Sequence, residues 1–405
     1  MKRVVITGAG AVSACGMGRD ALWTSARDGR SGVVKVDFTR NPRQSVHHAA
    51  PVPDAIWQQL KAEGRPRFQD RISMLALAAA REAAAHAGLE AADFGPRCAV
   101  VIGSGFGGAE TLDTSFYNFS LDPMSRVDPF AIPKIMTNAP ASWVSMEMKA
   151  TGPIYCVSTA CSSGAQSIGL GAQLVAAGLA DRCLAGGAEA LLVDAVFAAW
   201  EALHVMTGTC CRPFSKDRDG MVLGDGAGVV VLESEDAARA RGAPILAVLA
   251  GYGTTSDAMD LLRPDPAGPQ ACMQQAIEAS GLDASSIGYL NAHGTGTIAN
   301  DIAETEAMRR VFGQGFDDVL VSSTKPVHGH ALGAGGALEF IITLEALRSR
   351  LAPPTLNFTS VDPKIGFEPV HGEARAFNAP AALSNSFAFG GINASLLIAL
   401  PDAFH

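Results

Sequence analysis

Short hydrophobic runs rich in valine and isoleucine recur along the chain, each beside a turn of small residues. Such runs predict buried β-strands, here over residues 4–6, 99–102, 228–232, 245–249, 319–322 and 394–399. Between them lie long alanine-rich segments with helical character, including residues 72–87 and 165–177. Strands that alternate with helices in this way indicate an α/β fold.

The length of 405 residues exceeds that of an ordinary single core, so we expect two domains or two fused halves. The turn Arg241-Gly242-Ala243-Pro244 is the best candidate boundary, because glycine and proline interrupt regular structure there. It divides the chain into residues 1–243 and 244–405. No internal repeat can be aligned by eye.

Charge and cysteine content narrow the possible partners and the compartment. With 31 Lys and Arg residues against 40 Asp and Glu residues, the net charge is -9, a sign that repels a phosphate backbone and disfavours nucleic acid as a partner. The eight cysteines are scattered and form no CxxC pair. This argues against a disulfide framework and fits a reducing cytoplasm.

Two apolar stretches raise the question of membrane insertion. The run after Lys2 and Arg3 is too short for a signal peptide. Residues 150–180 carry no charge and are long enough to span a bilayer, but their many Thr, Ser, Gly and Pro residues would be costly in hydrocarbon. We therefore expect a strand, a tight turn and a helix there, without membrane insertion.

Three other motifs match known ligand sites only in part. Gly8-Ala9-Gly10 lacks the third glycine of a dinucleotide fingerprint, and residues 224–228 lack the lysine of a phosphate-binding loop. A close-packed turn from strand to helix explains the first motif and a turn into a strand the second. The pairs His47-His48 and His328-Gly329-His330 have no companion cysteines or carboxylates at ligand spacing, so we expect no metal.

Cys161 stands out among the cysteines because the segment Val157-Ser158-Thr159-Ala160-Cys161 joins a predicted strand to a predicted helix through small residues. A thiol at a helix N-terminus meets free backbone N–H groups and the positive end of the helix dipole, which favour the reactive thiolate. We therefore expect Cys161 to be a nucleophile. Cys156, Cys183 and Cys272 fit the ordinary role of a small buried residue.

Two histidine-containing loops follow, Asn291-Ala292-His293-Gly294-Thr295 and Lys325-Pro326-Val327-His328-Gly329-His330. Loops at strand ends are where functional residues gather. A lone loop histidine is usually a surface residue. Two such loops together with a cysteine turn make the nucleophile-and-base combination of covalent catalysis.

In this order and at this spacing, the motifs resemble those of the β-ketoacyl-[acyl carrier protein] synthases of the elongating type, within the thiolase-like superfamily. The resemblance covers nearly the whole chain and also rests on Ser323-Thr324-Lys325, Gly329-His330-Ala331-Leu332-Gly333-Ala334 and Ser384-Asn385-Ser386-Phe387. It implies a fold of two duplicated α/β halves in α-β-α-β-α layers and a dimer. It also implies decarboxylative condensation of malonyl and acyl thioesters held on acyl carrier protein.

Carried onto this chain, the resemblance implies that Cys161 takes up the acyl group and that His293 and His330 hold the malonyl thioester oxygen. The backbone N–H groups of Cys161 and Phe389 would form an oxyanion hole. Further residues implied at the site are Lys325, Glu304, Asp301 and Glu339 around the histidines, and Thr295 and Thr297 along the pantetheine arm. No cofactor is implied beyond the 4'-phosphopantetheine arm of the carrier.

The resemblance also implies an acyl pocket and gate formed by Phe106, Phe197, Phe387 and Phe389. Phe106 stands where the family usually has a smaller aliphatic residue, so we expect a preference for shorter or unusual acyl chains. By position, the residues expected to dock the carrier are Arg65, Arg67, Arg71 and Arg126.

Three departures from the family pattern bear on the pathway. Ala388 and Ile392 replace a usual glycine and a hydroxyl residue beside the gate, and His328 replaces a threonine. These changes point beyond housekeeping fatty-acid synthesis to specialised pathways, such as polyketide, aryl-polyene or nodulation-type acyl chains. His328 is expected to be either a third polar group near the site or a surface residue.

Other assignments within the superfamily fit less well. A thiolase would carry a second cysteine in a C-terminal Cys-x-Gly motif, and no cysteine follows Cys272. A starter-type synthase would show Cys, His and Asn in place of two His motifs with Lys325. A non-catalytic, chain-length-factor-like partner of a heterodimer would lack the active cysteine, whereas Cys161, His293 and His330 are all present.

Overall fold

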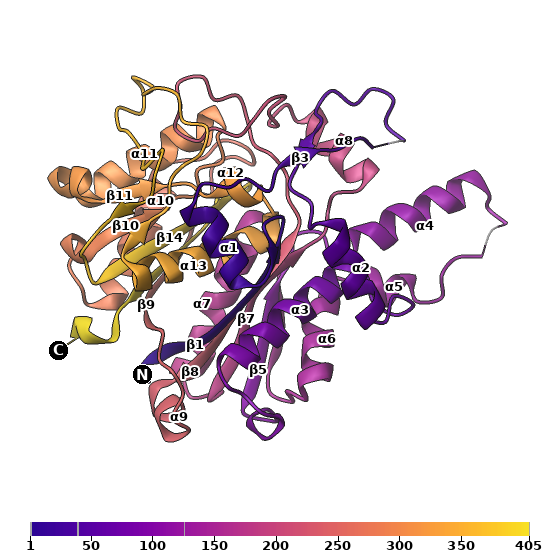
Figure 1. The fold of residues 1–405 in the computed structure, drawn as a ribbon, viewed down its shortest axis with the longest axis horizontal. Helices are drawn as coiled ribbons and strands as arrows, with labels where there is room; N and C mark the ends of the chain where they lie inside the picture. The colour runs from indigo at the N-terminus through magenta and orange to yellow at the C-terminus, as the bar shows by residue number, and fades with distance from the viewer. Residues whose placement is uncertain (1, 39, 125, 405) are drawn as a thin grey trace.

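A mixed sheet of eleven strands organises the computed structural model, which describes residues 2–38, 40–124 and 126–404 (Figure 1). The main strands are β1 (Val4–Ser13), β5 (Cys98–Gly103), β6 (Ile154–Val157), β7 (Arg182–Glu189), β8 (Gly226–Ser234), β9 (Ala247–Ser256), β10 (Ile287–Asn291), β11 (Leu320–Ser322), β14 (Ala381–Ala388) and β15 (Ile392–Ala399). The short β2 (Gly16–Met17) extends the sheet at β1, and two small ribbons pair β3 (Val34–Lys35) with β4 (His48–Ala49) and β12 (Leu351–Ala352) with β13 (Arg375–Ala376).

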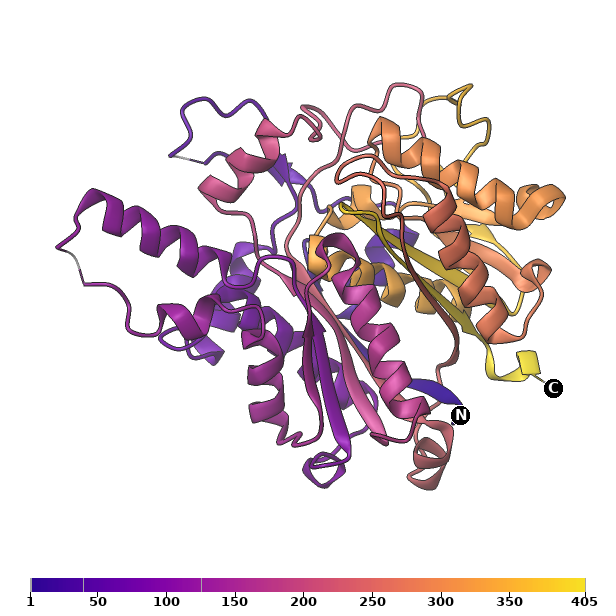
Figure 2. The same cartoon turned by 180° about the vertical axis from the view of Figure 1, so that it is seen from behind.

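Helices cover both faces of this sheet (Figures 1 and 2). They are α1 (Arg19–Arg27), α2 (Asp54–Glu63), α3 (Arg71–His86), α4 (Ala109–Leu121), α5 (Ala131–Ile135), α6 (Ala139–Met148), α7 (Ser163–Ala176), α8 (Asp194–Ala202), α9 (Glu235–Ala240), α10 (Ala267–Ser280), α11 (Ile298–Phe312), α12 (Lys325–His328) and α13 (Leu332–Ser349). Helix α3 packs on β1 and β8, α10 packs on β9 and β15, and α7 packs against α13 between the two halves of the sheet.

The strand order of the sheet is repeated. One half runs β6-β5-β7-β8-β1 and the other runs β11-β10-β14-β15-β9. Counted along the chain, each half has the order third, second, fourth, fifth, first. The halves meet where β1 pairs with β9 through Val5 with Val248 and Ile6 with Ala247. The duplication that no sequence repeat reveals is therefore visible in the topology.

Side chains alternate between the two faces of each strand, as β-geometry requires. In β5, Val100 packs in the core beneath α3, whereas Val101 packs in the central core around α7 and α13. In β15, Leu396 faces that central core, whereas Leu397 packs in a third core with residues of α10 and α11. The layers are α-β-α-β-α, which confirms the fold inferred from the resemblance.

The predicted strands and helices are confirmed, several of them with greater length. Strand β1 continues to Ser13, so Gly8 and Gly10 lie inside a strand, and the expected turn from strand to helix at this point is wrong. A Cβ on either glycine would lie 2.2 Å from a carbonyl oxygen of α3. Glycine is needed here because it lets the helix backbone pack directly on β1.

The uncharged segment 150–180 forms β6, a short turn and α7, as expected. No helix among the described residues is long and apolar enough to cross a membrane. The Arg241–Pro244 turn connects α9 to β9. The division of the chain at 243/244 stays a prediction.

The fold brings the candidate chemistry together through its central helices. Helix α7 begins just after Cys161, and α13 begins just after His330. A Cβ on Gly164 of α7 would lie 2.7 Å from the carbonyl oxygen of Gly333 in α13, so the two backbones are in direct contact at these first turns. The loops that follow β6, β10 and β11 therefore converge on one place.

Candidate active site

Cys161 lies in a tight turn between β6 and α7. The preceding residue, Ala160, has a φ of 50°, a left-handed conformation that a non-glycine residue keeps only when its surroundings hold it there. Ser163 provides that support, because its Oγ accepts the Thr159 N–H at 2.9 Å and donates to the Ala160 carbonyl at 2.7 Å. The predicted position of Cys161 at a turn before a helix is confirmed.

The Cys161 sulfur lies 3.0 Å from Nε2 of His330. Burial raises the pKa of the Cys161 thiol to about 12, and burial followed by the nearby Lys325 charge lowers the pKa of His330 well below its usual value. The resting pair is therefore a thiol beside a neutral imidazole. The thiolate expected from the helix position is wrong, because desolvation of a charge outweighs the favourable helix dipole.

His293 stands edge-on to His330, with ring centroids 5.4 Å apart and an interplanar angle of 81°. Its Nδ1 lies 3.2 Å from Nζ of Lys325, whose ammonium in turn lies 2.5 Å from Glu339 Oε1. Burial and then the Lys325 charge lower the pKa of His293 well below its usual value. Since an ammonium only donates, Nδ1 accepts and the ring proton resides on Nε2.

The remaining two acidic residues act on the backbone of the His293 loop. Glu304 accepts the N–H groups of His293 and Gly294, each at 2.8 Å. Asp301 accepts the N–H of Gly296 at 3.2 Å and the N–H of Phe214 at 2.8 Å. Both carboxylates are fully buried, and their bonds to backbone N–H groups fix the shape of the loop.

A cavity opens above these groups and is lined by both halves of the chain. Its lining includes Cys161, His293, His330, Thr295, Thr297, Trp200, Val205, Met221, Leu261, Leu262, Arg263, Asn300, Phe387, Ala388, Phe389 and Asn393. The hydroxyls of Thr295 and Thr297 lie 2.8 Å apart. The arrangement offers a nucleophile, a proton acceptor and a second imidazole donor to one substrate in a mostly apolar space.

Comparison with known proteins agrees with this chemistry. Residues 1–238 match the β-ketoacyl synthase N-terminal domain, and residues 246–359 match the β-ketoacyl synthase C-terminal domain. The chain belongs to the β-ketoacyl synthase family. It is 40% identical over 402 residues to nodulation protein E of a Rhizobium species and 37% identical over 404 residues to 3-oxoacyl-[acyl-carrier-protein] synthase 2 of Staphylococcus aureus, with 98% of each chain covered in both cases.

Solved structures show the same fold over the whole chain. The ishigamide ketosynthase/chain length factor structure matches with a TM-score of 0.92 and 31% identity, covering 98% of this chain and 99% of the other. A type II polyketide synthase ketosynthase in complex with its acyl-carrier protein matches with a TM-score of 0.90 and 27% identity at the same coverage. The chain is accordingly a condensing enzyme of the 3-oxoacyl-[acyl-carrier-protein] synthase type, an acyltransferase.

The four aromatic residues expected at the acyl pocket of the synthase differ in position. Phe387 and Phe389 line the cavity. Phe197 is completely buried behind it, in the same hydrophobic cluster as Cys161. Phe106 is 40% exposed and is not among the residues that line the cavity, so its place at the end of an acyl pocket stays a prediction.

The proposed gate is the hairpin between β14 and β15. Ala388 pairs with Ile392 across it, and Gly390 and Gly391 form the tip with φ values of 82° and 67°. Ser162, next to the nucleophile, donates to the Ile392 carbonyl at 2.6 Å. The hairpin is therefore anchored to the nucleophile turn beside its tip, and the added bulk of Ala388 lies at the cavity wall.

His328 is fully buried, so the expectation of a surface residue is wrong. Its Nε2 lies 3.3 Å from Oγ1 of Thr324. Burial, followed by the charge of Lys325, lowers the pKa of His328 to about 3. It is therefore a neutral polar group packed behind the catalytic loops, and it does not line the cavity.

Three of the four arginines expected to dock the carrier, Arg65, Arg67 and Arg126, are exposed. The expectation for Arg71 is wrong. Its guanidinium lies 3.2 Å from the buried carboxylate of Asp225 and only 17% of its side chain is exposed. Arg71 therefore compensates a buried charge within the protein.

Sequence reasoning missed several residues near the site, among them Trp200 and Glu189. Trp200 lines the cavity and stacks on Phe389 with ring centroids 5.8 Å apart, but nothing in its local sequence distinguishes it from a core tryptophan. Glu189 is a buried carboxylate at the end of β7. A signal for it exists, since it is a lone charge closing the small-residue run Gly186-Gly187-Ala188.

Proposed function

We propose that this synthase condenses a malonyl thioester with an acyl group carried on Cys161, in fatty-acid or specialised acyl-chain synthesis. The observation that carries the proposal is the 3.0 Å contact between the Cys161 sulfur and His330, in a buried cavity that also holds His293. These groups supply the nucleophile, the base and the second donor that such a condensation needs.

Acyl transfer is the first half-reaction. A thiol whose pKa is about 12 becomes nucleophilic only as it loses its proton, and His330 Nε2 accepts that proton while the sulfur attacks the acyl thioester. The backbone N–H groups of Cys161 and Phe389 stabilise the oxyanion. The thioester bond to the carrier then breaks, the carrier thiol takes the proton from His330, and the acyl group stays on Cys161.

Decarboxylation and condensation form the second half-reaction. Loss of CO₂ from the malonyl thioester leaves an electron pair that is delocalised onto the thioester oxygen as an enolate. His293 donates to that oxygen from Nε2, and His330 is the second donor after its ring proton has moved from Nδ1 to Nε2. The enolate carbon attacks the acyl carbonyl, the bond to Cys161 sulfur breaks, and the thiolate recovers a proton from solvent. The product is a β-keto thioester longer by two carbons.

Four further residues support these steps without contacting substrate. Lys325 sets the tautomer of His293, and Glu339 compensates the Lys325 charge in the protein interior. Glu304 and Asp301 hold the backbone of the His293 loop. We propose them as positioning residues.

The substrates are proposed to arrive on an acyl carrier protein. The solved complex of a related ketosynthase with its carrier supports this assignment. Because carrier proteins are acidic, the exposed Arg65, Arg67 and Arg126 are proposed to dock it. The pantetheine arm would then pass Thr295 and Thr297, and no other cofactor takes part.

A dimer is the proposed assembly, with the cytoplasm as its compartment. Strand β6 ends one side of the sheet, and its Ile154 and Tyr155 side chains are 42% and 48% exposed. Such an apolar sheet edge is suited to cover by a second subunit. The related ketosynthase paired with a chain length factor makes a heterodimer the alternative. The non-catalytic role is disfavoured, because Cys161 and His330 are in contact here.

In the test, the purified protein alone is mixed with malonyl-carrier and with acyl-carrier substrates of varied acyl length. The products are identified by mass spectrometry. Two-carbon extension by the wild type, and none by Cys161→Ala, would support the proposal. Extension only after a second, different chain is added would favour the heterodimer. Equal extension by wild type and Cys161→Ala would overturn the assigned nucleophile.

A further inference from the structure

Glu189, the last residue of β7, has a completely buried carboxylate that receives four hydrogen bonds. Its Oε2 accepts the N–H groups of Gly105 at 2.7 Å and Gly333 at 3.0 Å. Its Oε1 accepts the Phe106 N–H and the Ser104 hydroxyl, each at 3.2 Å. Burial raises the pKa of the Glu189 carboxyl to about 7, while the four donors favour its ionised, acceptor-only form.

The backbone around this carboxylate is shaped to receive it. A Cβ on Gly105 would lie 2.9 Å from Glu189 Oε2, and a Cβ on Gly333 would lie 2.7 Å from the same atom. The Gly333 position is equally close to the loop after β5, since its Cβ would meet the Gly105 nitrogen at 2.7 Å. Only glycine at these two positions leaves room for the carboxylate.

Three segments of the site meet at Glu189. The loop after β5 passes close to the nucleophile turn, since a Cβ added to Gly105 would lie 3.9 Å from Cα of Ala160. Gly333 belongs to the first turn of α13, which follows His330 directly. The carboxylate thus joins the N-terminal half, which carries Cys161, to the C-terminal helix behind His330.

We propose that Glu189 is a positioning residue that holds His330 within reach of the Cys161 sulfur. This inference rests on the proposed function. The bond from Gly333 ties the start of α13 to the same carboxylate that holds residues 104–106, and loss of the carboxylate would leave four donors without an acceptor. The start of α13 would then be free to move away from the nucleophile turn.

The Glu189 charge also acts on Cys161 directly. Besides burial, the charges of Glu339 and Glu189 raise the pKa of the Cys161 thiol, whereas Lys325 lowers it. Glu189→Gln keeps the shape of the side chain and removes the charge. It also turns an NH₂ group towards backbone N–H donors. We therefore expect Glu189→Gln to slow acyl transfer and at the same time to lower the pKa of the Cys161 thiol. Simple destabilisation of the fold does not produce this combination.

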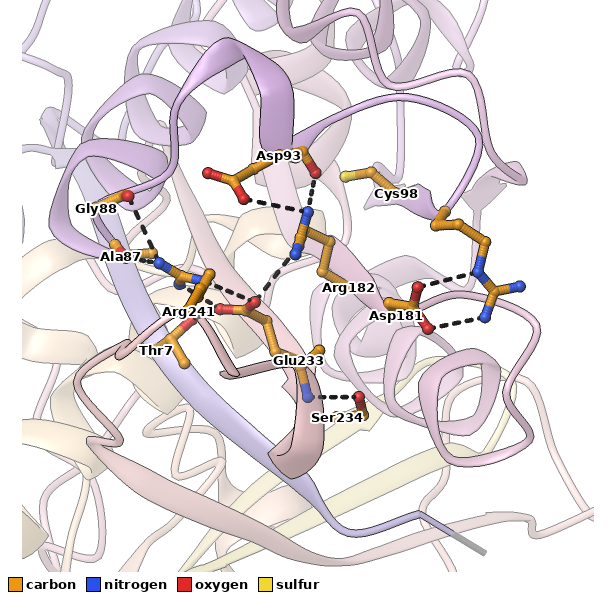
Figure 3. Close-up of polar contacts among 12 residues, drawn as sticks. Thr7, Ala87, Gly88, Asp93, Cys98, Asp181, Arg182, Glu233, Ser234 and Arg241 are labelled. Carbon is orange, nitrogen blue, oxygen red and sulfur yellow. Dashed lines mark hydrogen bonds and ion pairs between the residues drawn. The ribbon is translucent and has the colours of Figure 1, made fainter. Parts of the chain in front are cut away.

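Glu233 offers a matched control on the neighbouring strand. It is also completely buried, between Arg182 and Arg241 and with a 2.6 Å hydrogen bond from Thr7 (Figure 3). In the pairing of β7 with β8, Glu189 faces Gly226 whereas Arg182 faces Glu233, at the other end of the strands. That separation is about 23 Å, so Glu233→Gln removes a buried carboxylate without touching the site.

The experiment compares wild type, Glu189→Gln and Glu233→Gln by acylation rate at saturating acyl-carrier and by the pH dependence of iodoacetamide alkylation at Cys161. We expect Glu189→Gln to acylate at least 10-fold more slowly, with its alkylation midpoint shifted to lower pH. Glu233→Gln should be less stable than wild type. Its folded molecules should keep the wild-type acylation rate and the wild-type alkylation midpoint. Acylation at the wild-type rate in Glu189→Gln, an unshifted midpoint, or an equal loss in Glu233→Gln would overturn the proposal.

Ser104→Ala serves if Glu189→Gln does not fold, because it removes one donor and leaves the carboxylate in place. We expect a loss of about two- to fivefold in the acylation rate, and a wild-type rate would contradict the proposed role. Wild-type protein that never acylates Cys161 would instead overturn the proposed function, and this inference with it.

Discussion

The ammonium group of Lys325 lies 3.2 Å from Nδ1 of His293, and this contact determines which ring nitrogen can donate to substrate. An ammonium cannot accept a hydrogen bond, so Nδ1 accepts and Nε2 carries the proton. The neutral imidazole, whose pKa is lowered by burial and by Lys325, thereby becomes a hydrogen-bond donor for an enolate. Lys325 therefore supports this site by selecting the tautomer of His293.

This relationship can be tested by removing the buried charges together. Lys325→Met alone leaves Glu339 unpaired in the interior and should cost roughly 3–5 kcal/mol of unfolding free energy, measured in urea. The double variant Lys325→Met with Glu339→Gln should recover much of that stability. Decarboxylation of malonyl-carrier by the double variant, measured as CO₂ release, should remain slow, whereas acylation of Cys161 should persist. Wild-type decarboxylation in the double variant would contradict the tautomer assignment.

Buried histidines should make the protein less stable in acid. Burial holds the pKa of His328 at about 3 in the folded state, so only the unfolded chain binds a proton there as pH falls below about 6.5. Stability is therefore lost on acidification from pH 7 to 5, by about 2 kcal/mol for His328. Between pH 7 and 5, the unfolding free energy of His328→Gln, measured in urea, should fall by about 2 kcal/mol less than that of wild type. The exposed His204→Gln is the control, and identical pH slopes in the two variants would contradict this reading.

Phe106 remains the candidate determinant of acyl chain length. Its backbone N–H is fixed by Glu189, so the loop that carries the ring is held in place. Phe106→Ala should extend the accepted and produced acyl chains, because it removes volume at the expected end of the pocket. Product lengths are read by mass spectrometry, with Phe116→Ala on α4, a 66% exposed phenylalanine, as the control. An unchanged product distribution would remove Phe106 from the pocket.

Carrier docking should depend on exposed arginines. Arg67 lies over the rings of Phe68 and Phe130 at 5.5 and 5.8 Å and is exposed. Arg67→Glu should raise KM for carrier-bound substrate several-fold and leave KM for a pantetheine analogue unchanged, because only the carrier contacts the surface. Arg239→Glu on α9 is the control for a reversed surface charge. An equal effect on both substrates would argue against docking at Arg67.

Much of this structure is encoded in local sequence. The turn at Cys161 follows from small residues between a strand and a helix, and the predicted strands are present because their hydrophobic runs are short and bounded. The order and spacing of the motifs around Cys161, His293, Lys325 and His330 identified the family. Local sequence patterns are sufficient to predict a structural feature when a single segment of the chain determines it.

Long-range packing explains what local patterns missed. Arg71 is drawn inward by Asp225, a partner far along the chain. Trp200 reaches the cavity because it stacks on Phe389 of the opposite half. Burial raises the pKa of the Cys161 thiol, which the helix start alone does not reveal. These properties depend on how the two halves fit together.

The most direct test of the catalytic assignment locates the acyl group after mixing acyl-carrier and malonyl-carrier with wild type and His293→Ala. Peptide mapping by mass spectrometry should find the acyl group on Cys161 in both. In His293→Ala the acyl-enzyme should accumulate, because loss of one enolate donor should slow condensation by about 10²- to 10³-fold. An acyl group on any other residue, or condensation at the wild-type rate in His293→Ala, would contradict the account.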